Sequence, residues 1–298
     1  MSRENYCKKL TPAMQQVKKF KSEYPDCILF IRIGDFYETF FEDAEICAKE
    51  LDIVLTSHSK DADGNPIPLA GVPYHAVDTY LPRMIRRGYK VAICEQMEDP
   101  KLAKGVVKRD VIKVVTPGTA IDADIIPGGA AHYLMSLCTD SDSNSKLKLF
   151  GLAFIDITTG EFFVKEAEFD KNYQSLATEI ERYNPLEILV SKGISAKLIK
   201  YLASTCRVIT PIKESLFANG KDVLCRQFHV ESLDGFDTSS ELCINAAGAA
   251  LSYIKDTQKT DIPYIKSFSK RYDSGRMVLD AVTLKNLEIL SPLHGDRN

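Results

Sequence analysis

The feature that most constrains the fold is an alternation along the chain. Short runs rich in β-branched and aromatic residues are followed by segments whose apolar residues recur with the helical period. The first pattern is typical of strands and the second of amphipathic helices. Strands and helices that alternate in this way pack as sheets covered by helices. The 298 residues suffice for about two such domains, so we expect a mixed α/β protein.

Residues 1–117 are expected to form the first mixed α/β domain. Thr11 and Pro12 mark its opening helix, because a capping hydroxyl precedes a proline at the first helical position. The segment GDFYETFFEDA is predicted to turn at Gly34, with Asp35 capping a second helix over residues 36–51. The predicted elements are a helix from 12 to about 24, a strand over 27–33, the helix 36–51, a strand over 52–57, a shaped loop at 70–75, a helix from 76 to about 88, and strands at 90–96 and 111–118.

A linker and a second α/β domain are expected to follow. Pro-Gly steps on both sides of an acidic patch predict the linker at residues 118–127 and the second domain at 128–260. The predicted elements are a β-hairpin over 149–167, helices at 170–183, 195–204 and 239–258, and strands at 186–191 and 207–212. Residues 261–298, strand-like at 262–269 and helical at 276–290, are too few for a core of their own. They are expected to dock on the rest or to begin a third, mainly helical domain.

Composition excludes several classes of protein. No apolar run approaches the ~20 residues of a membrane helix, and the N-terminus lacks the features of a signal peptide, so we expect a cytoplasmic chain with no membrane partner. The eight cysteines are scattered without a Cys-x-x-Cys pair, which favours reduced, mostly buried thiols over disulfides or zinc. The net charge of −3 gives no global indication of nucleic-acid binding.

The sequence offers little support for an enzyme. It contains no Gly-x-x-x-x-Gly-Lys-Ser/Thr phosphate loop, no Gly-x-Ser-x-Gly elbow and no His-Glu-x-x-His. Asp156, at a strand end opening the hairpin, is the one candidate for a metal-dependent nuclease of ribonuclease-H-like shape, with Glu161 across the turn. A turn-forming aspartate is the simpler interpretation. We therefore expect no enzyme activity, no cofactor and no metal.

Basic residues gather in the first domain. One group is Arg83, Arg86, Arg87 and Lys90, and a second is Lys101, Lys104, Lys108, Arg109 and Lys113. Such a group is most often a solvated face, yet a few phosphate contacts are enough for useful affinity for nucleic acid.

The segment GDFYE allows two interpretations. As a capping box, Asp35 caps the helix and Glu38 reaches back to the cap amide, while Phe36 joins the core. Alternatively, Phe36 is an exposed wedge that enters a minor groove and unstacks a base step beside the basic groups. Glu38 would then face DNA, where phosphate repels a carboxylate, so it is useful only if it accepts a hydrogen bond from a base or carries a proton itself.

Segments along the whole chain resemble the MutS family of DNA mismatch repair proteins. They are residues 10–44, which contain RIGDFYETFFEDA, and residues 66–100, 104–119, 151–163 and 279–290. The resemblance implies a mismatch-recognition domain over about 1–117, a ribonuclease-H-like connector over about 128–260 and the start of a core or lever domain after 260. It also implies a non-catalytic connector, which favours the structural interpretation of Asp156.

The resemblance further implies the residues of a DNA site. The family's Phe-x-Glu motif corresponds to Phe36 and Glu38, with Phe36 stacking on the mispaired base and Glu38 bonding to it. Further contacts with the groove or with phosphate are expected from Arg32, Leu69, Gly71, Pro73, Tyr74, Lys108 and Arg109. The partner is mismatched double-stranded DNA.

Other properties of the family are expected only of longer members. These carry a clamp, a long lever and a C-terminal ATPase that binds ATP and Mg²⁺; they dimerise and recruit MutL. The chain is expected to be an N-terminal portion of such a protein and not to hydrolyse ATP. One further alternative stays open, a structural or partner-docking fragment that binds no DNA.

Overall fold

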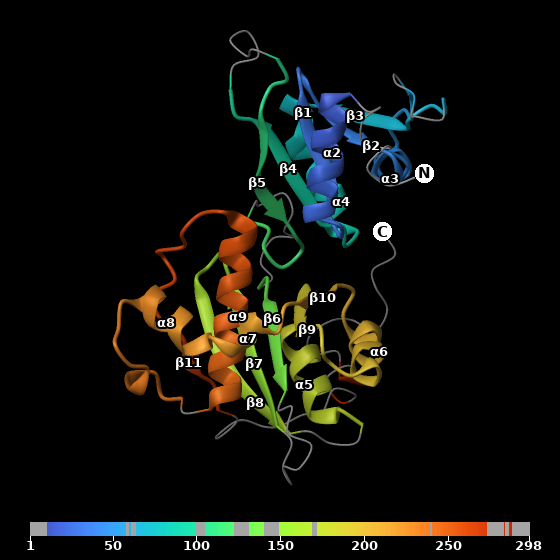
Figure 1. The fold of residues 1–298 in the computed structure, drawn as a ribbon. Helices are drawn as coiled ribbons and strands as arrows, with labels where there is room; N and C mark the ends of the chain where they lie inside the picture. The colour runs from blue at the N-terminus through green and yellow to red at the C-terminus, as the bar shows by residue number, and fades with distance from the viewer. Residues whose placement is uncertain are drawn as a thin grey trace. The chain divides into compact units, whose positions relative to one another are not determined.

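The computed structural model describes residues 11–57, 60, 64–98, 105–121, 131–139, 149–168, 172–238, 240–272, 283, 286 and 287. Two compact units are present (Figure 1). The first comprises Met1–Pro127 with Thr257–Lys259, and the second comprises Gly128–Asp256 with Thr260–Asn298. Each unit is a sheet covered by helices, so the prediction of a mixed α/β protein is confirmed.

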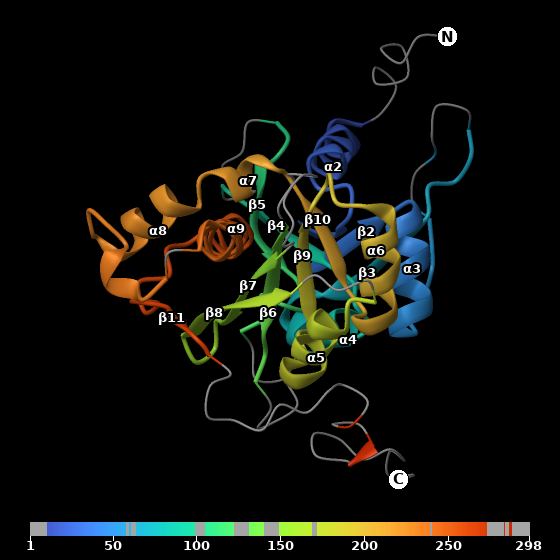
Figure 2. The same cartoon turned by 90° about the horizontal axis from the view of Figure 1, so that it is seen from below.

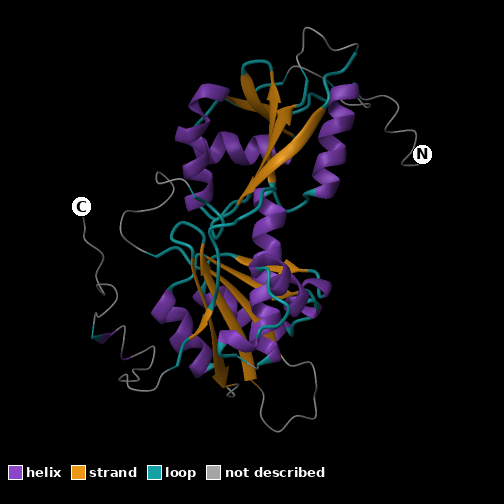
Figure 3. Cartoon of the chain, turned by 90° about the vertical axis from the view of Figure 1, so that its left-hand side faces the viewer, coloured by secondary structure: helices purple, strands orange, loops and turns teal. Residues whose placement is uncertain are grey.

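The first unit is built on a five-stranded sheet of order β3-β2-β1-β4-β5. Its strands are β1 (Ile28–Ile33), β2 (Phe36–Phe40), β3 (Leu69–Pro73), β4 (Val91–Gln96) and β5 (Arg109–Val115). Only β1 and β4 are parallel; the other neighbours pair antiparallel. Helices lie on both faces (Figure 3): α2 (Pro12–Glu23) packs on one, and α3 (Glu42–Leu51) and α4 (Val77–Arg86) pack on the other. The short η1 helix (Tyr74–Ala76) joins β3 to α4.

Helix α2 starts as predicted, and a buried carboxylate ties it to the sheet. The hydroxyl of Thr11 accepts a hydrogen bond from the Met14 amide at 3.4 Å. At the other end, the Lys21 ammonium lies 2.7 Å from the Asp43 carboxylate on α3. The second oxygen of Asp43 accepts the Leu29 amide at 3.0 Å, so one side chain links α2, α3 and β1.

The prediction of a helix over residues 36–51 is wrong in its first part. Residues 36–40 form strand β2, paired with β1, and the helix begins only at Glu42. The break is at Phe41, whose φ of 56° is incompatible with a continuing helix. Asp35 therefore caps no helix and lies in the β1–β2 turn, and the capping box with Glu38 does not exist.

Two neighbouring predictions are also wrong. Residues 52–57 form no strand; Thr56 makes an isolated bridge with Leu69. Residues 70–75 are not irregular, because Ala70–Pro73 belong to β3, whose amides and carbonyls pair with β2. The helix expected at 76–88 and the strands expected at 27–33, 90–96 and 111–118 are confirmed within a few residues as α4, β1, β4 and β5.

The second unit is built on a six-stranded sheet of order β10-β9-β6-β7-β8-β11. Its strands are β6 (Leu134–Thr139), β7 (Leu149–Asp156), β8 (Glu161–Glu168), β9 (Glu187–Ser191), β10 (Ile209–Ile212) and β11 (Ser269–Lys270). Helices α5 (Gln174–Tyr183) and α6 (Ala196–Thr205) cover one face; α7 (Ser215–Ala218), α8 (Gly220–Phe228) and α9 (Glu241–Gln258) cover the other (Figure 2). A short η2 helix (Asp234–Phe236) lies between α8 and α9. Helix α9 approaches the sheet so closely that a Cβ on Gly151 would lie 2.2 Å from the Leu242 carbonyl carbon.

Most predictions for this unit are confirmed. The elements that match are the hairpin β7–β8, the helices α5, α6 and α9, and the strands β9 and β10. Strand β6 and helices α7 and α8 were not predicted. Of the strand-like residues 262–269, only Ser269 is in a strand. The helix predicted at 276–290 lies outside the described residues except for Thr283, Asn286 and Leu287. The linker predicted at 118–127 is described only as far as Ile121.

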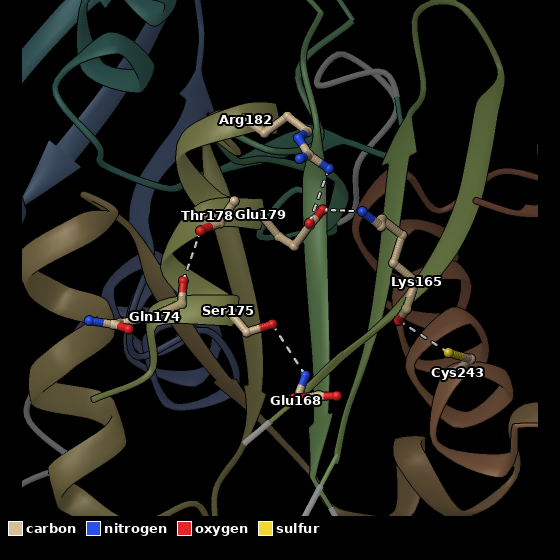
Figure 4. Close-up of polar contacts among 8 residues, drawn as sticks. All are labelled: Lys165, Glu168, Gln174, Ser175, Thr178, Glu179, Arg182 and Cys243. Carbon is tan, nitrogen blue, oxygen red and sulfur yellow. Dashed lines mark hydrogen bonds and ion pairs between the residues drawn. The ribbon is translucent and has the colours of Figure 1, made fainter. Parts of the chain in front are cut away.

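A charged pair is buried between β8 and α5. The Lys165 ammonium lies 2.7 Å from the Glu179 carboxylate, and Arg182 reaches the other oxygen of that carboxylate at 3.2 Å (Figure 4). The Lys165 side chain is 2% exposed and the Glu179 side chain 7% exposed. Burying two charges is tolerable only because they neutralise each other. The carbonyl of Lys165 also accepts the Cys243 thiol at 3.2 Å, which links the strand to α9.

The described cysteines are free thiols, and all of them are buried except the half-buried Cys225, as predicted; Cys7 lies outside the described residues. Burial raises the pKa of the Cys47 and Cys94 thiols to about 12.

Among the helices of the described residues, none has the length and apolar character to cross a membrane.

Candidate nucleic-acid interface

The tip of strand β2 carries the two residues of the Phe-x-Glu motif on one face of the sheet. Side chains alternate along a strand, so Phe36 and Glu38 lie on the same face, roughly 7 Å apart along the chain. Phe36 is 45% exposed, and Glu38 is half-buried. Tyr37 points to the opposite face, where its ring is buried and its hydroxyl donates to Glu95. A strand thus brings the motif residues together, whereas two residues apart on a helix would face apart.

Strand β3 lies beside this pair. Pro73 is opposite Phe36, and Gly71 is opposite Glu38. A Cβ on Gly71 would lie 3.5 Å from the Glu38 Cγ, an ordinary van der Waals contact, so the Glu38 side chain lies close over β3 at Gly71. Leu69 is different: it is 7% exposed, pairs with Phe40 and belongs to the core. The structure therefore brings Gly71 and Pro73 to the motif and places Leu69 in the core under α2.

The β1–β2 turn that presents Phe36 is held by several bonds. Gly34 has φ of 58°, a conformation that glycine adopts without strain. The Asp35 carbonyl accepts the Tyr74 amide at 2.9 Å, and the Gly34 carbonyl accepts Arg32 Nε at 2.5 Å. The Arg32 guanidinium also lies 3.6 Å from the centre of the Tyr74 ring. Tyr74 is 42% exposed, so a second aromatic ring stands at the same tip.

Arg109 and Lys108 differ in their surroundings. Arg109 Nε donates to the Arg32 carbonyl at 2.8 Å, and its Nη1 reaches the Val107 carbonyl at 3.1 Å. Burial lowers the pKa of Arg109, and the nearby Cys94 and Glu38 raise it in part. Lys108 is exposed, and its backbone amide binds Glu98. Of the two, Lys108 has the side chain in solvent, whereas Arg109 is committed to protein carbonyls.

The basic groups of the first unit are only partly available. The Arg87 guanidinium lies 2.5 Å from the Glu50 carboxylate, so its charge is balanced. Arg83 lies 5.9 Å from the Tyr80 ring on α4. Lys101 and Lys104 lie outside the described residues.

Sequence reasoning missed the polar residues that surround this tip on β4 and α2. Glu95 accepts the Tyr37 hydroxyl, Gln96 Nε2 approaches the Arg32 carbonyl at 3.4 Å, and Gln16 Oε1 lies 3.4 Å from Arg109 Nη1. Burial raises the pKa of Tyr37 and the Glu95 contact adds to this, so the phenol stays protonated and donates. A usable signal was the position of Glu95 and Gln96 at the end of an otherwise apolar predicted strand.

Asp156 has the surroundings of a structural residue. Its oxygens accept the Thr158 hydroxyl at 2.6 Å, the Thr158 amide at 2.8 Å and the His132 amide at 3.2 Å. Burial alone would raise the pKa of Asp156, but these hydrogen bonds outweigh it and lower the pKa below its usual value. Within the described ranges, no three His, Cys, Asp or Glu side chains gather in an arrangement able to hold a metal ion. The hydrogen bonds support the role of turn former.

The same region gives a pH prediction. The His132 side chain is 6% exposed, neither ring nitrogen has a hydrogen-bond partner among the described residues, and burial lowers its pKa although Asp156 opposes this. Below about pH 6.5, His132 therefore binds a proton in the unfolded chain more readily than in the folded chain. The free energy of unfolding consequently decreases as the pH decreases below this value. Asp156 adds a second decrease in the free energy of unfolding below about pH 4, because its lowered pKa favours the folded state only while the carboxyl is ionised.

Urea unfolding between pH 8 and pH 3 measures this dependence. His132→Phe is expected to flatten the change in unfolding free energy between pH 7 and 5 and to leave the change below pH 4 in place. His75→Phe serves as control, because His75 is exposed. A wild-type stability independent of pH between 7 and 5 contradicts the prediction.

Comparison with known proteins follows the same division into two units. The model of MutS domain I matches residues 11–124, and that of MutS domain II matches residues 132–266. The chain belongs to the MutS family. DNA mismatch repair protein MutS of Methanosarcina mazei is 43% identical over 302 residues, covering 97% of this chain and 33% of the relative. The proteins of the same name from Methanococcoides burtonii and Symbiobacterium thermophilum are 42% and 40% identical, covering 97% and 96% of this chain.

The chain spans about a third of the length of these curated relatives, 33% for the Methanococcoides protein. It corresponds to the MutS domain I and domain II region. In MutS terms, the tip of β2 with Phe36 and Glu38 lies in domain I, and the hairpin with Asp156 lies in domain II.

Proposed function

We propose that the chain binds duplex DNA and recognises base mispairs and small insertion or deletion loops in mismatch repair. The observation that carries the proposal is the exposed ring of Phe36 beside Glu38 on one face of β2, in a domain that belongs to the MutS family. Phe36 is the wedge that enters the minor groove at the lesion. Glu38 contacts the base.

The physical basis is the weakness of DNA at a lesion. A mispaired or unpaired base has lost pairing and stacking energy, so the duplex kinks there at lower cost than elsewhere. A ring that unstacks one base step therefore binds more tightly where the step is already loose. The protein senses deformability, and a carboxylate at the ring's side restricts which base edge fits.

Several neighbours support the groove contact. Pro73 and Gly71 on β3 lie directly opposite Phe36 and Glu38, and Tyr74 follows them with its ring exposed. These residues are proposed to line the groove, with Gly71 keeping the backbone close to the DNA. Lys108, exposed just before the start of β5, is proposed to contact phosphate.

Fluorescence anisotropy tests the proposal. The probes are a matched duplex and duplexes with a single G·T or an unpaired T, each at two salt concentrations. Tighter binding of the lesion duplexes, with affinity falling as salt rises, is expected. Equal affinity for all three duplexes would remove lesion recognition from this chain, and salt-independent or absent binding would favour a partner-docking fragment.

Activities of longer MutS proteins are not proposed for this chain. The sequence contains no phosphate loop of the Gly-x-x-x-x-Gly-Lys-Ser/Thr type. We propose that ATP hydrolysis, dimerisation and MutL recruitment belong to the complete family protein. An ATPase assay on the chain is expected to give the background rate.

A further inference from the structure

We propose that Arg32, Tyr74 and Arg109 are positioning residues and not phosphate contacts. They hold the β1–β2 turn, which presents Phe36, in one conformation. This inference rests on the proposed function, because it concerns how Phe36 is presented to DNA. The side chains of these three residues, the Tyr74 amide and the carbonyls of Gly34 and Asp35 are together called the turn brace below.

The direction of Arg32 is the first observation. Arg32 pairs with Tyr37 across β1 and β2, so its side chain lies on the face of Tyr37 and not on the face of Phe36. Its guanidinium lies 3.6 Å from the centre of the Tyr74 ring and 5.8 Å from that of Tyr37. A phosphate bound beside Phe36 would therefore lie on the face of the sheet opposite to the Arg32 side chain.

The bonds of Arg32 close a ring around the turn. Nε donates to the Gly34 carbonyl at 2.5 Å while the plane of the same guanidinium stacks on Tyr74. The Tyr74 amide in turn donates to the Asp35 carbonyl at 2.9 Å. Both carbonyls that precede Phe36 are thus fixed from β1 and from the start of η1. Guanidinium is suited to this task because it can stack with its plane and donate with its edge at once.

Arg109 acts from the other side. It faces the Phe36 side of the sheet through its pairing with Gln96, and its Nε donates to the Arg32 carbonyl at 2.8 Å. Its positive charge also interacts with Glu38. Arg109 therefore fixes the backbone of Arg32, the residue that braces the turn, and lies near the carboxylate of the motif.

The function of such a brace is preorganisation. Ordering a loose turn on binding costs free energy. A ring whose position is already fixed avoids this cost, so more of its binding energy is available to unstack a base step. The turn brace lets the Phe36 ring arrive in its bound orientation. Discrimination between matched and lesion duplexes then depends on the brace even though its two arginines bind no phosphate.

The two roles predict different results for Arg32→Lys, tested in the full chain. A phosphate contact survives this change, because the charge is kept. The turn brace does not, since one ammonium cannot stack on Tyr74 and bind the Gly34 carbonyl together. We expect the lesion preference to fall at least fivefold, while affinity for matched duplex and the slope of log affinity against log salt stay unchanged.

Two further variants sharpen the test. Tyr74→Phe keeps the stacked ring and is expected to retain the lesion preference, whereas Tyr74→Leu loses the stack and is expected to lose it. Arg226→Lys on α8, an exposed arginine of the second unit, is the matched control. A salt slope reduced by about one in Arg32→Gln, with the lesion preference intact, would assign Arg32 to phosphate and overturn the proposal.

Hydrogen exchange in the absence of DNA separates the brace from the proposed function. Arg32→Lys is expected to speed exchange of the Tyr74 amide at least tenfold and to leave the amides of β4 unchanged. Unchanged exchange at Tyr74 overturns the brace, whatever the DNA results. If the Tyr74 amide responds but wild-type chain and Phe36→Ala bind all duplexes alike, the brace exists and the mismatch function is what fails.

Discussion

Phe36→Ala is expected to erase the preference for lesion duplexes and to leave salt-dependent binding of matched duplex in place. An aromatic ring stacked on a base contributes about 1–3 kcal/mol, which corresponds to roughly 5- to 150-fold in affinity. Removing the ring removes this contribution only where the ring is inserted. Contacts with phosphate are untouched, so the salt slope is expected to stay the same.

The decisive control for Phe36 lies on the same strand and the same face. Phe40 is 7% exposed and packs in the core, whereas Phe36 is 45% exposed. Phe40→Ala is therefore expected to cost about 3–5 kcal/mol of unfolding free energy, and Phe36→Ala less than about 1 kcal/mol. Thermal unfolding followed by circular dichroism measures both.

Conservative variants complete the series. Phe36→Tyr keeps a stacking ring and is expected to retain most of the lesion preference, and Phe36→Leu is expected to be intermediate. If Phe36→Ala lowers stability as much as Phe40→Ala does, Phe36 is a core residue and the wedge is wrong. A lesion preference that survives Phe36→Ala contradicts the wedge directly.

The error at β2 shows what sequence periodicity can and cannot decide. Tyr37, Phe40 and Phe41 fall at helical spacing, and a strand with apolar residues on both faces shows no alternation to oppose them. The acidic residues Glu42 and Asp43 were the better signal, since they lie in the first turn of the real helix. The positive φ of Phe41, which ends the strand, leaves no mark in the residue types.

The resemblance points to Phe36 and Glu38 without regard to secondary structure, and their role in DNA binding stays a prediction. The surroundings of these two residues were predicted less well. Leu69 was expected at the groove and lies in the core, while Gln96 and Gln16 near Arg109 were not singled out. Long-range pairing decides such cases: Arg109 meets Arg32 only because β4 lies between β1 and β5. No local pattern encodes that order of strands.

The buried pair of Lys165 and Glu179 shows the same limit and yields a large expected effect on stability. In the sequence, FVKEA and ATEIE look like ordinary surface segments with charges. In the folded chain the two side chains face each other 2.7 Å apart and almost without solvent. Lys165→Met is expected to cost about 3–5 kcal/mol, because it leaves the Glu179 carboxylate buried with only Arg182 to balance it.

The double variant decides whether the pair stabilises the unit or is merely tolerated. Lys165→Met with Glu179→Leu leaves no buried charge unpaired, so it is expected to recover most of the loss and to be within about 1 kcal/mol of wild type. Urea unfolding followed by tyrosine fluorescence and circular dichroism measures all the variants. Lys19→Met, which breaks the exposed pair with Glu23 on α2, is the control and is expected to change stability by less than about 0.5 kcal/mol. A Lys165→Met chain as stable as this control would mean that water reaches Glu179, and a double variant as unstable as the single would mean that packing around α5, not charge, sets the cost.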